Sequence, residues 1–359
     1  MEPTKTTTYV PTESCDARTS CATCAPQASI MPNSTSVLNH FNRPLLSTFT
    51  SPCITLMTTD DSNHIHESGW IRPGAATQGW HGLNIFCVVS MHLIAALALI
   101  PGTFSWWAVG ICFFMFWIVG GLGVCLGYHR LLTHGSFKTT RPVRWILTMF
   151  GTLSYQGSPL QWVGTHRIHH AHSDDHHDPH SPGHGFTWSH ILWTFYRHPE
   201  GLDPEDFTHD LRRDPSMVRL DRYFWLPQAV LAILLVIAGW LIMGTWQYGV
   251  GWMAWGVGIR SVVLFHATWF VNSAAHTWGY RNFETTDGSR NNWWVALLSF
   301  GEGWHNNHHA QQRSAAHGMR RWEVDPTWWT ILLLKKLGLA WDIVHPKLPT
   351  PPTQPNASA

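Results

Sequence analysis

Charged residues are scarce in this sequence, and their scarcity excludes several classes of protein. Lys, Arg, Asp and Glu make up 13% of the 359 residues, against roughly 25% in an ordinary soluble domain. The 23 basic and 22 acidic residues give a formal net charge of +1, so the basic excess of a nucleic-acid-binding protein is missing. We therefore expect no nucleic-acid partner. With 45% hydrophobic residues, so little charge is typical of a chain that contacts lipid.

Cysteine is also sparse. Seven cysteines in a chain of this length do not indicate a disulfide framework. Cys21 and Cys24 form one CxxC, but no second Cys pair or nearby His completes a zinc site. Because residues 1–80 are rich in Ser, Thr and Pro and lack any run of signal-peptide or membrane-span length, we predict a disordered tail there. A membrane domain at 81–346 and a loose C-terminal tail at 347–359 follow.

The few charges avoid two windows of the chain. No charged residue falls between 83 and 126, and Arg260 is the only one between 223 and 275. Inside these windows the apolar stretches have 18 to 23 residues, enough to cross the ~30 Å hydrocarbon core as helices. The four predicted transmembrane helices are about 83–100, 105–127, 223–243 and 249–271.

The four stretches form two tight hairpins, joined by the charge-free loops 101–104 and 244–248. If all four span, both termini and the long loop 128–222 lie on one side of the membrane, together with the Lys and Arg residues. The positive-inside rule makes that side the cytoplasm. The predicted fold is an all-α integral membrane protein, with four transmembrane helices in two hairpins and a cytoplasmic helical cap. Gly123 and Gly127 form a GxxxG that would let two helices approach closely.

Histidine, in contrast, is abundant, with 25 residues. His129 and His134 directly follow the second apolar stretch, and Asn272 and His276 end the fourth. Two HxxHH units, 166–170 and 305–309, each place three imidazoles at i, i+3 and i+4 on one face of a helix. Because the hairpins return these groups to the same membrane surface, we expect nine histidines to lie close together.

Nine imidazoles are too many for one tetrahedral zinc ion, but they divide into two ions with four or five ligands each. Imidazole suits Fe, Cu, Zn and Ni alike. A two-metal centre beside a membrane, with no carboxylate in its motifs, points to redox chemistry on a lipid-soluble substrate, and we predict two iron ions. Isolated His92 and His266 are expected in the core. The remaining histidines are expected in a solvated loop: His172, His176, His177, His180 and His184.

The boxes HRLLTH, HRIHH, NSAAH and HNNHH resemble those of the membrane-bound fatty acid desaturases. The likeness is to the Δ9 group, which includes stearoyl-CoA desaturase and the bacterial and cyanobacterial acyl-lipid desaturases. It extends to Asp178-Pro179-His180 and Gly301-Glu302-Gly303-Trp304-His305, and covers roughly residues 83–345.

The resemblance implies a di-iron centre in the cap. It would insert a cis double bond, at the Δ9 position, into a saturated acyl chain with O2 and two electrons. Asn272 would reach one iron through a water. The other ligands carried over from the family are His129, His134, His166, His169, His170, His276, His305, His308 and His309. Electrons would come from a separate carrier, ferredoxin or cytochrome b5, at a bacterial inner membrane or the endoplasmic reticulum.

Residues around the ligands can also be assigned. Asp178 and Glu302 are predicted to orient metal-bound imidazoles, and Arg167 and Arg197 to contact the substrate head group. The substrate is an acyl-lipid or an acyl-CoA. Two alternatives remain: a di-iron acyl hydroxylase or ketolase on the same scaffold, and a metal transporter with His-rich loops. A transporter should carry ionisable ligands near the bilayer midplane, where only Arg260 and His266 are candidates.

Overall fold

The computed structural model describes residues 79–198 and 201–348. The predicted tails 1–80 and 347–359, including the CxxC, lie outside the described residues except for 79–80 and 347–348.

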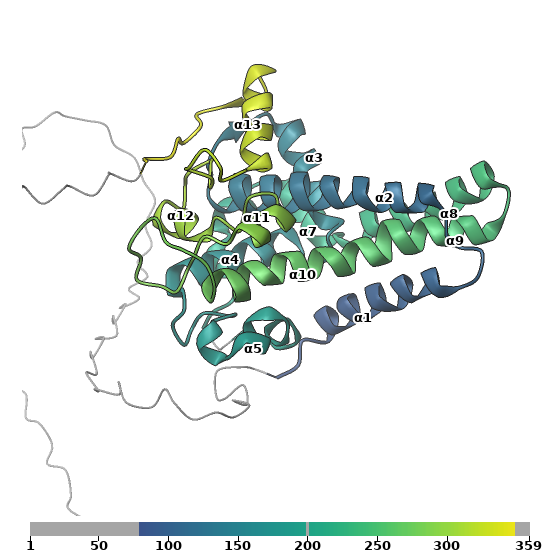
Figure 1. The fold of residues 1–359 in the computed structure, drawn as a ribbon, viewed down its shortest axis with the longest axis horizontal. Helices are drawn as coiled ribbons and strands as arrows, with labels where there is room; N and C mark the ends of the chain where they lie inside the picture. Colours follow the sequence, from purple (N-terminus) through teal and green to yellow (C-terminus); the bar gives the residue numbers. More distant parts are fainter. Residues whose placement is uncertain (1–78, 199–200, 349–359) are drawn as a thin grey trace, which may run out of the picture. The chain divides into compact units, whose positions relative to one another are not determined.

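In the part of the chain that the structure describes, four helices are long and apolar enough to cross a membrane, as the charge-free windows predicted. They are Gly82–Leu99, Trp106–Thr133, Trp225–Met243 and Trp246–His276, and they lie side by side (Figure 1). The first consists of α1 (Gly82–Ala96) and a 3₁₀ turn, the second of α2 (Trp106–Phe116) and a π-helical segment (Trp117–Thr133), and the third is α8 (Trp225–Met243). The fourth runs through α9 (Trp246–Met253), a π-helical turn (Ala254–Ile259), α10 (Arg260–Ser273) and a 3₁₀ turn (Ala274–His276). The protein is therefore an integral membrane protein of the predicted helical class.

The second and fourth helices are longer than their apolar stretches. They end at Thr133 and His276, not near 127 and 271. Beyond the apolar stretches both helices are covered by the cap, so polar residues such as His129 continue the helix while remaining buried. These extensions carry two of the histidine groups out of the bundle on rigid helices.

The hairpin turns are built from local signals. Ser105 caps α2 by accepting a hydrogen bond from the Ala108 amide at 3.1 Å. Gly244 ends α8 in the left-handed conformation, at φ +82°, where its amide donates to the Trp240 carbonyl. Each turn therefore needs no charged residue to reverse the chain.

The remaining elements form a cap at one end of the long helices (Figure 1). Four cap helices start with a capping side chain followed by proline in the first turn, which satisfies the free backbone amides and fixes the entry of the chain. The cap helices are α3 (Arg141–Thr152), α4 (Pro159–His172), α5 (Phe186–His190), α6 (His209–Arg212), α7 (Pro215–Arg222), α11 (Trp293–Leu298), α12 (His305–Ala310) and α13 (Pro326–Lys336). Three 3₁₀ turns, Pro182–His184, Leu192–Phe195 and Pro204–Phe207, join them. In the described ranges the only ladder pairs β1 (Lys138–Thr139) antiparallel with β2 (Ala340–Trp341).

The GxxxG of the second long helix packs against the cap helix α3. A Cβ on Gly123 would lie 2.5 Å from the Gly151 amide nitrogen, and one on Gly127 would lie 2.8 Å from the Leu147 carbonyl oxygen. The two glycines thus allow α3 to approach the π-helical segment closely. This contact fixes the cap relative to the histidines of that segment.

Candidate metal centre

The four histidine groups meet inside the cap, where they form two clusters. The five-histidine cluster draws on three elements and consists of His129, His134, His166, His170 and His308. Its ligand nitrogens all lie within 4.8 Å of one another. The Nε2 atom of His308 lies 3.1 Å from Nε2 of His129 and 2.9 Å from Nε2 of His170.

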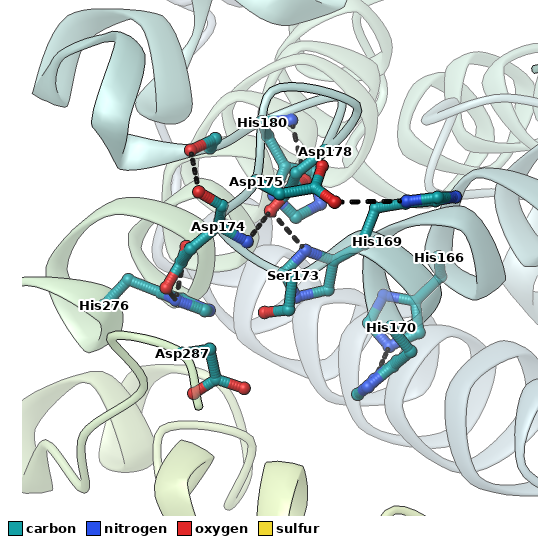
Figure 2. Close-up of polar contacts among 12 residues, drawn as sticks. His166, His169, His170, Ser173, Asp174, Asp175, Asp178, His180, His276 and Asp287 are labelled. Atoms are coloured by element: carbon teal, nitrogen blue, oxygen red, sulfur yellow. Dashed lines mark hydrogen bonds and ion pairs between the residues drawn. The ribbon is translucent and has the colours of Figure 1, made fainter. Parts of the chain in front are cut away.

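The four-histidine cluster lies beside it and consists of His169, His276, His305 and His309. Its ligand nitrogens are also within 4.8 Å of one another, and all four residues are buried. The Nε2 atom of His309 lies 3.3 Å from that of His169 and 3.0 Å from that of His305. His169 and His170 are neighbours on α4 but belong to different clusters, so one helix holds the two clusters together (Figure 2).

The nitrogens fit metal ligation better than hydrogen bonding. Ligands bound at about 2.0–2.1 Å in tetrahedral or octahedral geometry are separated by roughly 2.9–3.4 Å, which is the spacing of the Nε2 atoms in both clusters. Across residues 79–198 and 201–348, the Nε2 atoms of His134 and His276 are buried without any hydrogen-bond partner. Buried polar atoms normally have a partner, so each cluster has the donor set and a free nitrogen for an ion.

Electrostatics favour the neutral, ligating form of these rings. For four imidazoles, burial and then the neighbouring imidazoles lower the pKa well below its ordinary value: His166, His170, His305 and His308. A neutral imidazole keeps one nitrogen lone pair for a metal.

Four of the rings contact a carboxylate through Nδ1, which turns Nε2 toward the cluster. The two predicted carboxylates lie in such positions: Asp178 is 2.9 Å from Nδ1 of His169, and Glu302 is 2.7 Å from Nδ1 of His129. Although burial alone would raise the pKa of Asp178, His169 and His180 hold it well below its usual range. The carboxylate therefore stays ionised and accepts the Nδ1 proton.

Two further carboxylates contact the rings: Asp174, a weaker candidate from the sequence than Asp178, and Asp287, which the sequence analysis did not name. Asp174 lies 3.0 Å from Nδ1 of His276 (Figure 2). Asp287 lies 2.7 Å from Nδ1 of His309. Asp174 is close to the second box, but nothing in its spacing distinguishes it from Asp175. Asp287 belongs to the loop before α11, and only the tertiary fold brings it to the cluster.

Glu302 contacts two further side chains besides His129. Arg130, which is fully buried, contacts Glu302 at 3.1 Å and Asp325 at 3.0 Å. His317, also fully buried, places Nδ1 2.8 Å from Glu302. No histidine motif includes His317, so it could not be recognised from its spacing. Glu302 therefore links the second long helix to the segment around 302–325.

The expectation of a solvated loop after the second box is wrong for His180. Its side chain is buried, with its ring centroid 4.3 Å from that of His169 and its amide donating to Asp178 at 3.1 Å. Burial lowers the pKa of His180 to about 3, more than the nearby Asp178 raises it. His180 is buried because the chain turns at Asp178 and folds the residue against His169, although the loop is polar.

A cavity of about 400 Å³ adjoins the clusters. His129, His305 and Asn272 line one part of it, and much of the remaining wall is apolar, including Val88 and Phe265 from two of the long helices. Asn272 belongs to neither cluster but lies one helical turn before His276. The cavity can hold a flexible apolar chain beside the metal centre.

The two arginines predicted at the head group have different surroundings. Arg167 uses all five N–H donors on the protein itself, bonding the carbonyls of Leu132, Thr133 and Phe207 and both oxygens of Asp210. Arg197 lines the cavity. Of the two, Arg197 is therefore the arginine placed in the cavity wall.

Comparison with known proteins agrees with this geometry. A model of the fatty acid desaturase family matches residues 104–332. The chain belongs to this family. It is 49% identical over 261 residues to an sn-1 stearoyl-lipid 9-desaturase of Anabaena variabilis, covering 73% of this chain and 93% of that protein. It is 48% identical to an sn-2 palmitoyl-lipid 9-desaturase of Nostoc sp. (strain 36), covering 73% and 90%.

More distant relatives act on other substrates. An acyl-CoA C20 Delta5-desaturase of Anemone leveillei is 39% identical over 279 residues, covering 77% of this chain and 85% of that protein. Membership in the family makes this desaturase an oxidoreductase, and together with the two histidine clusters it implies a metal site.

Proposed function

We propose that this desaturase inserts a cis Δ9 double bond into an acyl chain esterified in a membrane lipid, with O2 and two electrons. The observation that carries the proposal is the pair of histidine clusters beside an apolar cavity. Three relatives named for lipid-linked substrates support the head-group assignment, because they are 47–49% identical to this chain, whereas the relatives named for acyl-CoA substrates are 39% identical.

We infer that the clusters hold two iron ions. The five-histidine cluster and the four-histidine cluster would each bind one ion through their Nε2 atoms, with Asn272 contacting one of them through a water. Imidazole-rich sites accept several transition metals. Iron fits the proposed reaction because O2 chemistry on an unactivated C–H bond needs a redox-active ion.

The residues of the chain have a positioning role. An unactivated methylene is too weakly acidic for any side-chain base, so the bound iron pair supplies the oxygen-dependent removal of hydrogen. The cavity holds the acyl chain so that two adjacent methylenes face the clusters. Each methylene loses one hydrogen atom, and O2 takes up these two hydrogen atoms together with two electrons and two protons to become two waters. Asp174, Asp178, Asp287 and Glu302 keep the imidazoles in orientation.

The lipid head group would be contacted by Arg197. This residue lines the cavity, and a guanidinium binds phosphate or ester oxygens well. All five N–H donors of Arg167 bond to acceptors of the protein, so this residue would stabilise the fold and not contact the substrate. The electron donor would be ferredoxin in a bacterium or cytochrome b5 in a eukaryote, and it would approach a cap that faces the cytoplasm.

Expression in a host that lacks its own desaturase tests the reaction. Gas chromatography of total fatty acids, with double-bond location by mass spectrometry, should show new Δ9 monounsaturated chains. Hydroxylated or keto chains without a new double bond would instead support the hydroxylase or ketolase alternative.

A second measurement tests the substrate class. Membranes containing the enzyme and a reducing system are supplied with saturated chains either in a glycerolipid or as acyl-CoA, with acyl transfer blocked. Product should appear in the glycerolipid, and product formed only from acyl-CoA would contradict the lipid assignment.

A further inference from the structure

The last residue of α4 and the loop that follows it carry a third group of metal-ligand side chains, separate from the two clusters. It consists of His172, Asp175 and His177, whose ligand atoms all lie within 4.8 Å of one another. None of these residues belongs to the five-histidine or four-histidine cluster. All three are at least partly accessible, with side chains 31%, 45% and 44% exposed, so an ion can reach them from solution.

We propose that His172, Asp175 and His177 form a third metal site, which binds a divalent transition-metal ion of the Zn²⁺ type. Two imidazoles and one carboxylate are a common protein ligand set for such ions, with the remaining positions taken by water.

The distances favour a shared ion over simple ion pairs. One carboxylate oxygen of Asp175 lies 3.2 Å from Nδ1 of His172, and the other lies 3.8 Å from Nδ1 of His177. The longer separation is beyond a hydrogen bond. Ligands about 2.0–2.2 Å from one ion are separated by roughly 3–4 Å, so a small shift of the exposed rings brings all three ligand atoms onto one ion.

The backbone holds the three ligands in this arrangement before any ion binds. Asp174 adopts the left-handed conformation, at φ +64°, which reverses the chain directly after α4. The Asp175 amide donates to the His172 carbonyl at 2.9 Å, and the His177 amide donates to the Asp175 carboxylate at 2.6 Å. The loop that carries the ligands is thus a tight turn, so little ordering remains for the ion to impose.

The same turn positions two carboxylates of the metal centre. Asp174 contacts His276, Asp178 contacts His169, and the Asp174 amide donates to the Asp178 carboxylate at 2.9 Å (Figure 2). Two residues of the third site, Asp175 and His177, lie between them in sequence and have exposed side chains. An ion bound there joins the end of α4 to the middle of the turn, and so stabilises the segment that orients His169 and His276.

Equilibrium dialysis of the full-length, iron-containing protein in detergent against ZnCl2 tests the site. Zinc and iron are both counted by elemental analysis in the wild type, in the double variant His172→Ala/His177→Ala, and in His209→Ala as a matched exposed-histidine control. The wild type and the control should bind one zinc ion more per chain than the double variant, with equal iron in all three. Equal zinc binding by all three proteins would overturn the proposal, as would extra zinc matched by an equal loss of iron.

Cobalt distinguishes this site from the cysteines of the first 80 residues. Co²⁺ bound at the third site should give only the weak visible bands of nitrogen and oxygen ligation, and these bands should be absent in Asp175→Asn, a milder variant that keeps the size of the side chain. If the bands that depend on Asp175 include intense sulfur-to-cobalt absorption, or if Asp175→Asn leaves the spectrum unchanged, the assignment is wrong.

Discussion

At the scale of single residues, the atom in contact with Nδ1 sets the direction of each ring. A carboxylate at Nδ1 keeps the proton on that nitrogen and leaves Nε2 free to ligate. His129, His169, His276 and His309 all have such a partner. Three of these rings, His169, His276 and His309, belong to the four-histidine cluster, so the orientation of that cluster depends on three aspartates. His129 belongs to the five-histidine cluster, whose orientation depends on Glu302.

Replacing His308 by Ala should remove a ligand from the middle of the five-histidine cluster. Its Nε2 atom lies about equally far from those of His129 and His170, so no neighbour can fill the position. We expect desaturation to fall by at least about 100-fold, with iron content measured in the purified protein falling too. The exposed His209→Ala is the control and should keep both. Normal iron content and activity in His308→Ala would contradict the ligand assignment.

Replacing Asp178 by Asn should weaken metal binding without removing a ligand. The amide can donate to Nδ1 as well as accept from it, so the orientation and basicity of His169 are no longer fixed. We expect iron affinity to fall by about 10- to 100-fold, as measured by competition with a chelator. Asp206→Asn, at an exposed position of the cap, should leave the affinity unchanged.

The residues that the sequence could predict are those with helical spacing or direct adjacency to a box. Three imidazoles at i, i+3 and i+4 share a helix face in any context, and Asp178 and Glu302 belong to stretches that share the family resemblance. Asp287 and His317 reach the site through loops whose path depends on the tertiary fold. His180 was misplaced because a polar loop can still be buried when a tight turn folds it against a cluster.

At the scale of elements, the helix that carries His129 depends on close packing. The charge-free windows predicted where the four spans are, but they placed the ends of two helices too early. The apolar stretch ends where contact with lipid ends, whereas the helix continues into the cap. The second long helix is π-helical from Trp117 to Thr133, and this segment includes its continuation beyond the apolar stretch. At its end the amide of His134 donates to the carbonyl of His129, five residues back. Helix α3 covers this continuation, which is how it stays helical with polar residues.

Gly123→Ala should disturb this contact. The added Cβ would lie 2.5 Å from backbone atoms of α3, which cannot move away independently. Overpacking of this kind costs about 1–3 kcal/mol, so the melting temperature in detergent should fall by several degrees. Gly110→Ala, on the same long helix, is the matched control because nothing lies within 4 Å of its Cβ, and it should not lower the melting temperature. Equal melting temperatures for the two variants would show that α3 yields to the added group.

At the scale of the whole molecule, the two hairpins bring histidines from positions 129 to 309 to one end of the bundle. The sequence predicts this meeting because an even number of spans returns the chain to the side where it started. The cavity could not be predicted in the same way, since its walls combine side chains from α1, α10 and several loops of the cap. Its volume depends on how these elements pack.

The orientation in the membrane can be tested by cysteine labelling in a bacterial host. The turns at 100–105 and 243–246 carry no charge, while the cap carries many Lys and Arg, so the cap should face the cytoplasm. Thr245→Cys, exposed in the second turn, should react with a membrane-impermeant maleimide in intact cells whose outer membrane has been made permeable. Asp206→Cys in the cap should react only after the inner membrane is broken. The wild type, with the seven cysteines of its own sequence, supplies the background, and the labelling of each variant is counted above it. Labelling of Asp206→Cys but not of Thr245→Cys in intact cells would reverse the orientation and place the metal centre on the outer side.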